Sequence, residues 1–152
     1  MVARALISVV TPCYNEEGNV DELHRRIVAQ FDQLPDYDFE HIYIDNASTD
    51  GTVAAIRRLA KTDSRVRAIV NNRNFGIIRS SNYGLLQARG DAVVNMASDM
   101  QEPPELIVDF FEAVDVEDDD GACKLRPARV LDGLFKLLEE SAYRELLIHA
   151  MV

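Results

Sequence analysis

Acceptor oxygens are concentrated in the stretch NMASDMQEPPE, which runs from Asn95 to Glu105 and begins where a hydrophobic run ends. Asp99, Gln101 and Glu102 lie close together, and two prolines follow them directly. Proline restricts its own backbone and that of the residue before it, so these side chains are held in a fixed direction. The stretch therefore presents carboxylate and amide oxygens at the end of a predicted buried strand.

Two more polar clusters follow hydrophobic runs, TPCYNEEGN from Thr11 and DNASTDGT from Asp45. Each cluster alone has an ordinary structural interpretation. The first has the turn residues of a strand-to-helix loop, the second can cap a helix, and EPPE suits a helix start. Three such clusters in order on the same side of one sheet are harder to explain in this way.

Hydrophobic periodicity divides the first two-thirds of the chain into alternating strands and helices. Short apolar, β-branched runs predict buried strands, and helical spacing of apolar residues predicts the helices. We expect strands at 5–11, 39–45, 65–71 and 91–97, and helices at 19–34, 50–61, 77–89 and 106–114. Asn19 and Glu22 fit a capping box for the first helix, and Ser48 or Asp50 should cap the second.

This alternation predicts an α/β fold with a mainly parallel sheet and helices on both faces. In such folds ligands bind beyond the carboxyl ends of the strands, so the three polar clusters should converge on one crevice. We place the main unit at residues 1–114. Residues 115–152 extend the same domain, with an acidic turn at 115–121 and one long apolar helix at 130–152.

Composition narrows the function classes. The chain has 152 residues, enough for one domain with a core, and a net charge of −10. That charge disfavours nucleic acid and anionic membrane surfaces as partners. Cys13 and Cys123 lack metal-ligand spacing and suggest reduced thiols in the cytoplasm. The apolar run at 5–10 is too short for a signal peptide or a transmembrane segment, and no other run is long enough.

The sequence resembles the family 2 glycosyltransferases with the GT-A fold, close to the dolichyl-phosphate and polyprenyl-phosphate sugar transferases. The resemblance is carried by VVTPCYNEEGNV, YIDNASTDGT, NRNFG, LLQARGD and ASDMQEPPELI, between about residues 7 and 107. The opening P-x-Y-N-E-E signature of the family falls on Pro12, Tyr14, Asn15, Glu16 and Glu17. Its second motif falls on Asp45, Ser48 and Asp50.

The resemblance implies a metal site for Mg²⁺ or Mn²⁺. The family usually has D-x-D followed by a glutamine and P-P-E; here Asp99 takes the second aspartate, Gln101 the glutamine, and Ala97 the place of the first aspartate. Hard divalent ions prefer oxygen ligands and also bind the diphosphate of a nucleotide sugar. Asp99 and Gln101 would supply two ligands, and diphosphate and water the rest.

The same resemblance gives nucleotide-binding roles to the other motifs. Pro12 and Tyr14 would line the base pocket, and Glu16 and Asp45 would accept hydrogen bonds from the base or ribose. Ser98 would approach the nucleotide beside Asp99. The alternatives are core packing for the tyrosine and helix capping for the aspartate at position 45.

The implied reaction transfers a sugar from a nucleotide-diphosphate donor to an acceptor, which the resemblance suggests is polyprenyl phosphate. A hydroxyl acceptor would need a general base. DGACKLRPARVLDGL resembles a later family segment that contains such a carboxylate; the matching residue is Asp119 or Asp120, and we take Asp120 as the candidate. The alternative is that residues 118–120 are a solvated acidic turn.

The chain lacks a long stretch that family members carry between the P-P-E helix and this later segment. Two functions therefore stay open: an active glycosyltransferase, in the cytoplasm or peripheral on the cytoplasmic face of the membrane, and a non-catalytic domain that binds nucleotide sugars or partners. The apolar face of helix 130–152 would favour a homo-oligomer. A dinucleotide-binding fold is disfavoured because no G-x-G-x-x-G follows the first strand, and a phosphoacceptor switch because the expected acidic pair is absent there.

Overall fold

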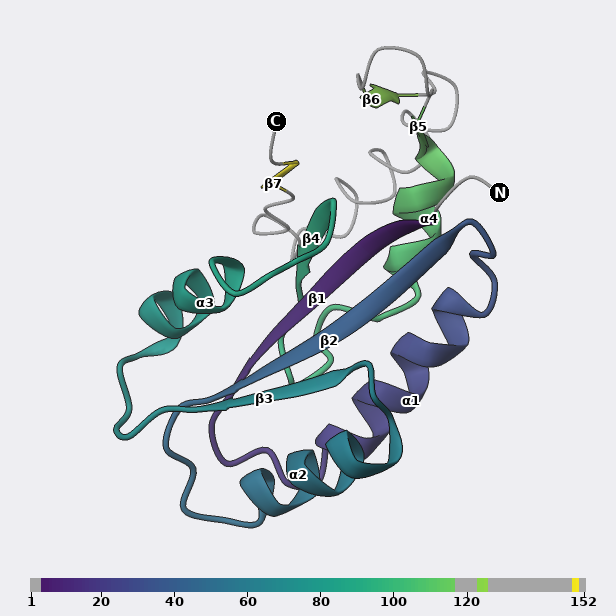
Figure 1. Cartoon of the computed structure of the whole chain (residues 1–152). Helices are drawn as coiled ribbons and strands as arrows, with labels where there is room; N and C mark the ends of the chain where they lie inside the picture. Colours follow the sequence, from purple (N-terminus) through teal and green to yellow (C-terminus); the bar gives the residue numbers. More distant parts are fainter. Residues whose placement is uncertain (1–3, 117–122, 126–148, 151–152) are drawn as a thin grey trace.

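The computed structural model describes residues 4–116, 123–125 and 149–150 (Figure 1). Within these residues, strands and helices alternate as the hydrophobic pattern predicts. The elements are β1 (Ala5–Cys13), α1 (Val20–Phe31), β2 (Tyr37–Asp45), α2 (Thr52–Thr62), β3 (Val66–Val70), α3 (Ile77–Leu85), β4 (Ala92–Asn95), α4 (Leu106–Ala113), β5 (Val114–Val116), β6 (Cys123–Leu125) and β7 (His149–Ala150).

The main sheet has the strand order β3-β2-β1-β4-β7. Strands β1 to β4 are parallel, with Cys13 opposite Asp45 and Ile7 opposite Ala92 in the register. The two residues of β7 pair antiparallel with β4, and β5 and β6 form a separate antiparallel pair. The predicted α/β class with a mainly parallel sheet is therefore confirmed.

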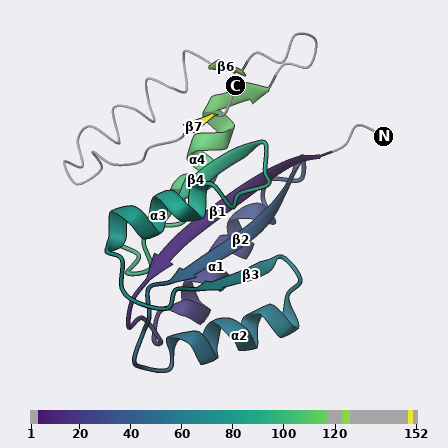
Figure 2. The same ribbon diagram turned by 60° about the vertical axis from the view of Figure 1, so that its left-hand side comes forward.

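Helices cover both faces of the sheet, as predicted. In Figures 1 and 2, α1 and α2 lie on one side and α3 on the other. Side chains alternate accordingly along β1: Ile7 and Val9 belong to the core cluster with α1, α2 and α4, whereas Val10 packs on the other face with Leu85 of α3. The apolar runs are strands buried on both faces, which explains why they show no polar alternation.

Helix α1 forms because its apolar residues recur at helical spacing. Val20, Leu23, Ile27 and Phe31 are all buried against the sheet. Burial of one such side chain contributes about 1.5–3 kcal/mol relative to exposure. This stripe holds the loops at both ends of the helix in place.

The predicted caps are only partly correct. Asn19 occupies the N-cap of α1 without a side-chain cap bond; its amide instead donates to Glu16 Oε2 at 2.6 Å. The predicted capping box is therefore wrong, because the side chain of Asn19 hydrogen-bonds to the carboxylate of Glu16 and not to the helix backbone. Helix α2 begins after Gly51 rather than at a polar cap, although Asp50 Oδ1 accepts a hydrogen bond from Thr52 N at 3.0 Å.

The C-terminal third differs from the sequence prediction where the structure describes it. The expected acidic turn begins instead with strand β5, which contains Asp115 and Val116. The expected helix at 130–152 is wrong at His149–Ala150, which forms β7. Pairing with β4 satisfies backbone groups that an open sheet edge would leave free. Residues 117–122 and 126–148 lie outside the described residues.

Two buried polar networks were not predicted. On the α1 face, Thr11 Oγ1 lies 3.0 Å from His41 Nε2, and His41 Nδ1 lies 3.1 Å from His24 Nδ1. His24 Nε2 lies 3.1 Å from Asp63 Oδ2. The carboxylate can only accept, so His24 donates through Nε2 and accepts at Nδ1, and His41 then donates through Nδ1 and accepts from Thr11.

The second network lies on the α3 face, at the opposite end of the strands from the polar clusters. Ser8 Oγ donates to Glu40 Oε1 at 2.7 Å, and Arg67 donates to Glu40 Oε2 at 2.7 Å. The backbone N–H of Arg89 also donates to Glu40 Oε1, at 2.8 Å. These donors lower the pKa of Glu40 against the opposing effect of burial. Both networks satisfy side chains that would be costly to bury alone.

Candidate functional site

Backbone with positive φ occurs in the loop after each of the four parallel strands. Asn15 follows β1 with φ 57°, Ala47 follows β2 with φ 64°, Gly76 follows β3 with φ 82°, and Met100 follows β4 with φ 55°. An L-residue in this region costs roughly 1–2 kcal/mol. Such strain concentrates at functional sites, so its position at the carboxyl edge of the sheet marks this edge as the candidate site.

The loops after β1 and β2 are fastened to each other. The backbone N–H of Asn15 donates to Ser48 Oγ at 2.9 Å, and Asn15 Oδ1 accepts from the N–H of Thr49 at 2.8 Å. The N–H of Glu16 donates to Thr52 Oγ1 at 2.7 Å, and Glu17 Oε2 accepts from Gly51 N at 2.5 Å. The signature residues Asn15 and Glu17 thus shape the site and do not face a ligand directly.

A pocket of about 300 Å³ lies between these loops and the loops after β3 and β4. It brings together five of the predicted residues. Its lining comprises Pro12, Cys13, Tyr14, Glu16, Asn46, Asn74, Gly76, Ile77, Ala97, Ser98 and Asp99. We call it the strand-end pocket. Its size and mixture of polar and flat apolar groups suit a small polar ligand.

Tyr14 and Glu16 present different groups to the strand-end pocket. Tyr14 is 46% exposed, which argues against the alternative that it packs in the core. Its ring gives a flat surface on which a planar ligand can stack. Glu16 is held by the Asn19 amide and offers its remaining acceptor positions to the pocket.

Asp45 is fully buried at the end of β2 and is not part of the pocket lining. Its Oδ2 accepts from Ser48 N at 3.1 Å, as in a turn, but its Oδ1 has no hydrogen-bond partner among the described residues. A buried carboxylate oxygen without a donor is costly. Asp45 is next to two lining residues, Asn46 in the chain and Cys13 in the sheet register, and has an unused acceptor; its predicted contact with a nucleotide stays a prediction.

The predicted metal ligands lie close in sequence but are not equivalent in space. Asp99 is exposed and lines the strand-end pocket, and its Oδ1 accepts from the backbone N–H of Gln101 at 3.2 Å. Gln101 is exposed and does not line the pocket. Within the described ranges, no group of three or more His, Cys, Asp or Glu side chains is arranged to hold a metal ion. Of the two predicted metal ligands only Asp99 lines the pocket, and it fits a cation only if the ligand supplies most of the other oxygens.

The sequence reasoning gave no role to the loop after β3, yet it forms one wall of the pocket. Asn46 fastens this loop: its Nδ2 donates to Asn74 Oδ1 at 2.8 Å, and its Oδ1 accepts from Phe75 N at 2.9 Å. Asn74 and Gly76 line the pocket. The available signal was NRNFG, which combines asparagines with a glycine directly after a strand.

The loop that carries Asp99 is anchored to α1. Glu105 accepts from Arg26 Nε at 3.1 Å and from a second guanidinium nitrogen, and Arg26 also contacts the sulfur of Met100 at 3.5 Å. The guanidinium lowers the pKa of the Glu105 carboxyl. Arg26 thereby holds both ends of the segment that includes the strained Met100.

Cys13 lines the pocket but is not suited to nucleophilic chemistry. Burial and the nearby Asp45, Glu16 and Asp50 carboxylates all raise the pKa of its thiol well above the ordinary value. Only the thiolate is a strong nucleophile, so Cys13 acts as an apolar wall.

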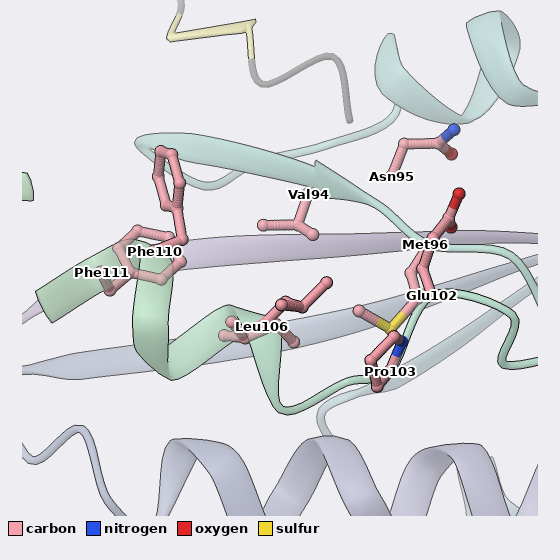
Figure 3. A pocket seen from close by; sticks show the side chains of 9 residues that line it. Val94, Asn95, Met96, Glu102, Pro103, Leu106, Phe110 and Phe111 are labelled. Atoms are coloured by element: carbon pink, nitrogen blue, oxygen red, sulfur yellow. The ribbon is translucent and has the colours of Figure 1, made fainter. Parts of the chain in front are cut away.

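A second, apolar pocket lies between β4 and α4 (Figure 3). The figure shows Val94 of β4 on the side of Leu106, Phe110 and Phe111 of the helix, and Met96, just past the end of the strand, beside Pro103. The polar groups in its lining are Asn95 and Glu102, and Asn95 Oδ1 has no partner in the part of the chain that is described. This lining offers few groups for a phosphate or sugar, so the strand-end pocket is the better candidate.

The doubly wound parallel sheet with a pocket at its carboxyl edge places the chain among the α/β proteins that bind ligands at this edge. The sequence pattern of the family described as glycosyl transferase family 2 matches residues 8–149. The chain therefore belongs to glycosyl transferase family 2.

Relatives and solved structures agree with this assignment. The undecaprenyl-phosphate 4-deoxy-4-formamido-L-arabinose transferase of Aeromonas hydrophila is 39% identical over 109 residues, 71% of this chain and 33% of that protein. The enzyme of the same name from Edwardsiella ictaluri is 32% identical over 141 residues, 86% of this chain and 43% of that protein. This chain spans less than half the length of either relative.

The mannosyltransferase PcManGT from Pyrobaculum calidifontis, solved with GDP-Man and Mn²⁺, superposes with a TM-score of 0.57. It is 30% identical, and the match covers 67% of this chain and 30% of that one. The GT-A class suggested by the sequence is thus confirmed. Among the described residues, no helix has the length and apolarity needed to span a bilayer.

Proposed function

We propose that this chain binds a nucleotide-diphosphate sugar in the strand-end pocket and transfers the sugar to polyprenyl phosphate. The observation that carries the proposal is the pocket itself, built by four loops, each with a residue of positive φ, around Tyr14, Glu16, Ser98 and Asp99. The two undecaprenyl-phosphate transferases among the relatives support a lipid-phosphate acceptor. The GDP-Man bound to the mannosyltransferase supports a nucleotide-sugar donor.

Each pocket residue contacts a different part of the nucleotide sugar. Tyr14 stacks on the base, with Pro12 beside it, and Glu16 accepts hydrogen bonds from base or ribose. Asp45 joins them when the ligand supplies a donor to its unused Oδ1. Hydrogen bonds to a charged acceptor are worth about 1.5–3 kcal/mol each. Ser98 lies next to Asp99 and approaches the phosphates.

The donor set at Asp99 fits a divalent cation that arrives with the diphosphate. With Ala97 in the place of a second carboxylate, Asp99 is the single acidic group in the strand-end pocket on the β4 side. Mg²⁺ or Mn²⁺ bound there would stabilise the negative charge of the departing diphosphate. Gln101 contributes by its backbone N–H, which holds Asp99 in place, and by its side-chain oxygen if the segment rearranges.

The chemistry of the acceptor determines whether the reaction needs a general base. A polyprenyl phosphate oxygen is ionised near neutral pH and attacks without a general base. A sugar hydroxyl would need one, and Asp120, the candidate for that role, lies outside the described residues. A lipid acceptor also requires a position at the cytoplasmic face of the membrane. Self-association through residues 130–152, which lie mostly outside the described residues, stays a proposal.

One observation favours a second function. The chain spans 33% and 43% of the two relatives, and transfer requires donor and acceptor to be held together. Alignment of two reactants can supply roughly 7–11 kcal/mol of a barrier. A chain that keeps the donor pocket but less of the acceptor half would bind nucleotide sugars without transferring them.

Turnover measurements separate the two functions. Radiolabelled UDP-sugars and GDP-sugars are incubated with polyprenyl phosphate, with and without Mn²⁺, and lipid-linked label and free nucleotide are counted. Transfer that Asp99→Asn abolishes, and that the exposed α4 variant Asp109→Asn leaves intact, supports the transferase. Nucleotide binding without turnover supports the binding domain. If the protein neither binds nucleotide sugars nor transfers sugar, both proposed functions are contradicted.

A further inference from the structure

Helix α3 differs from an ordinary surface helix in which side chains it turns toward the sheet. The side chains that it buries fully against the sheet are the small ones, Ser80, Ser81 and Gly84, and the half-buried Leu85 packs beside them. A Cβ at Gly84 would lie 2.6 Å from Val10 Cγ1 and 2.8 Å from Ile44 Cδ1. The helix therefore packs closely on the sheet by presenting its small residues inward.

Apart from Leu85, the large apolar side chains of α3 and of its C-cap are exposed. Ile78 is 73% exposed, Leu86 80% and Tyr83 47%. At 100° per residue Leu86 and Arg79 fall opposite Ser80, Ser81 and Gly84, and Ile78 and Tyr83 fall on the two flanks of the outer side. We call Ile78, Arg79, Tyr83 and Leu86 the outer α3 face. A surface helix normally shows the reverse arrangement.

The charge around this face is opposite to that of the chain as a whole. Residues 71–90, which are α3 and the loops beside it, contain three arginines and none of the 26 acidic residues of a chain with net charge −10. Arg73, Arg79 and Arg89 form no ion pair with another described residue, and Arg73 lies over the Phe75 ring at 4.7 Å. These guanidinium groups are available to an anionic partner.

We propose that the outer α3 face docks on an anionic lipid surface. Apolar side chains with flanking arginines, and a tyrosine with an apolar body and a polar tip, are the features of helices that lie in a membrane interface. A second copy of the chain is a poorer occupant, because two arginine-rich faces would repel each other. The acidic remainder of the chain is repelled by the same surface, which orients α3 toward it.

Docking in this way places the strand-end pocket beside the membrane. Ile77 begins α3, is 66% exposed and lines that pocket. A molecule held in the bilayer would reach the pocket at this point. The inference extends beyond the proposed function, because docking requires neither nucleotide nor transfer.

Co-sedimentation of the full 152-residue chain with vesicles tests the inference. Vesicles of 30% phosphatidylglycerol in phosphatidylcholine are compared with pure phosphatidylcholine, at low and high salt. We expect binding to the anionic vesicles that falls steeply in roughly 0.5 M salt. Arg79→Glu and Leu86→Ser should each lower the partition coefficient roughly tenfold. Both positions are exposed, so folding is checked by thermal melting.

Two matched variants serve as controls. Arg57→Glu makes the same charge change on the exposed part of α2, across the sheet. Val70→Ser removes another exposed apolar side chain, from β3. Both should bind vesicles as the parent does. Failure of the parent to bind, equal binding by the α3 and control variants, or equal binding to uncharged vesicles would overturn the inference. So would α3 variants that lose self-association in light scattering instead of vesicle binding.

Discussion

Glu105 accepts two hydrogen bonds from the guanidinium of Arg26, although 79 positions separate the two residues. One belongs to the segment that carries Asp99 and the other to α1, which is fixed by its buried stripe. The pair is partly exposed, so its direct contribution to stability is at most about 1 kcal/mol. Its larger effect is to fix the position of the predicted metal ligand.

Glu105→Gln should therefore weaken metal-dependent nucleotide binding more than it lowers the free energy of unfolding. An amide keeps the size of the side chain but loses the charge-assisted bonds. Calorimetric titration and thermal melting measure the two effects. Glu22→Gln breaks the exposed Arg25–Glu22 pair on the same helix and should change neither. A similar loss of affinity in both variants would contradict the positioning role.

Much of the fold could be predicted because local patterns and topology agree. The runs that form β1 and β2 are apolar on both faces, and the apolar residues from Val20 to Phe31 lie on one face of a helix. These patterns predict the α/β fold class and the order of strands and helices along the chain. The carboxyl-edge rule then brought Pro12, Tyr14 and Ser98 together before any distance was known.

Other features depend on contacts that sequence spacing does not encode. Asn19 was expected to cap α1, but Glu16 engages its amide. The role of Asn46 in holding the loop of Asn74 depends on where β3 delivers that loop. The sequence predicts the helix at 77–89 but not the exposed apolar side chains of α3, because periodicity shows that a helix has an apolar face and not which way that face points.

The unused oxygen of Asp45 predicts a loss of affinity without a loss of folding. Asp45→Asn keeps an oxygen for the N–H of Ser48 but loses the charge. We expect normal melting and a loss of nucleotide affinity of roughly 1.5–3 kcal/mol, the worth of a hydrogen bond to a charged group. If a calorimetric titration shows unchanged nucleotide affinity, Asp45 serves only to accept the hydrogen bond from Ser48 in the turn.

The positive φ of Ala47 predicts that glycine is more stable at that position. Ala47→Gly relieves the left-handed strain, offset by the greater freedom of glycine in the unfolded chain, for a net gain of about 0.5–1 kcal/mol. Ala54→Gly makes the same chemical change within α2, where it should cost about 1 kcal/mol. Chemical denaturation gives both values, and shifts of the same sign would refute the argument.

The buried histidines predict a loss of stability on mild acidification. Burial lowers the pKa of both His24 and His41, so the unfolded chain binds more protons below about pH 6.5, the usual histidine pKa. Their stabilising contribution is complete above that pH and is lost as the pH falls. The slope is up to about 1.4 kcal/mol per pH unit for each histidine.

The pH range in which the histidines lose their stabilising contribution is separate from that of the carboxylates. Asp63, Glu40 and Glu105 have lowered pKa values, so their contribution is lost only below about pH 4. Unfolding free energies of the parent and His41→Gln between pH 7.5 and 5 test the assignment. The variant should be less stable at pH 7.5 and show a flatter slope, and parallel curves would contradict it.

Nucleotide binding in the presence and absence of a divalent cation tests the central claim most directly. UDP-sugars and GDP-sugars are titrated into the parent protein with Mn²⁺ or with EDTA, and into Asp99→Ala and Tyr14→Ala. We predict one site, with binding that is tighter with Mn²⁺, loses its cation dependence in Asp99→Ala, and weakens in Tyr14→Ala under both conditions. Absence of binding with Mn²⁺, or binding that neither substitution alters, would contradict the assignment of the strand-end pocket as a nucleotide-sugar site.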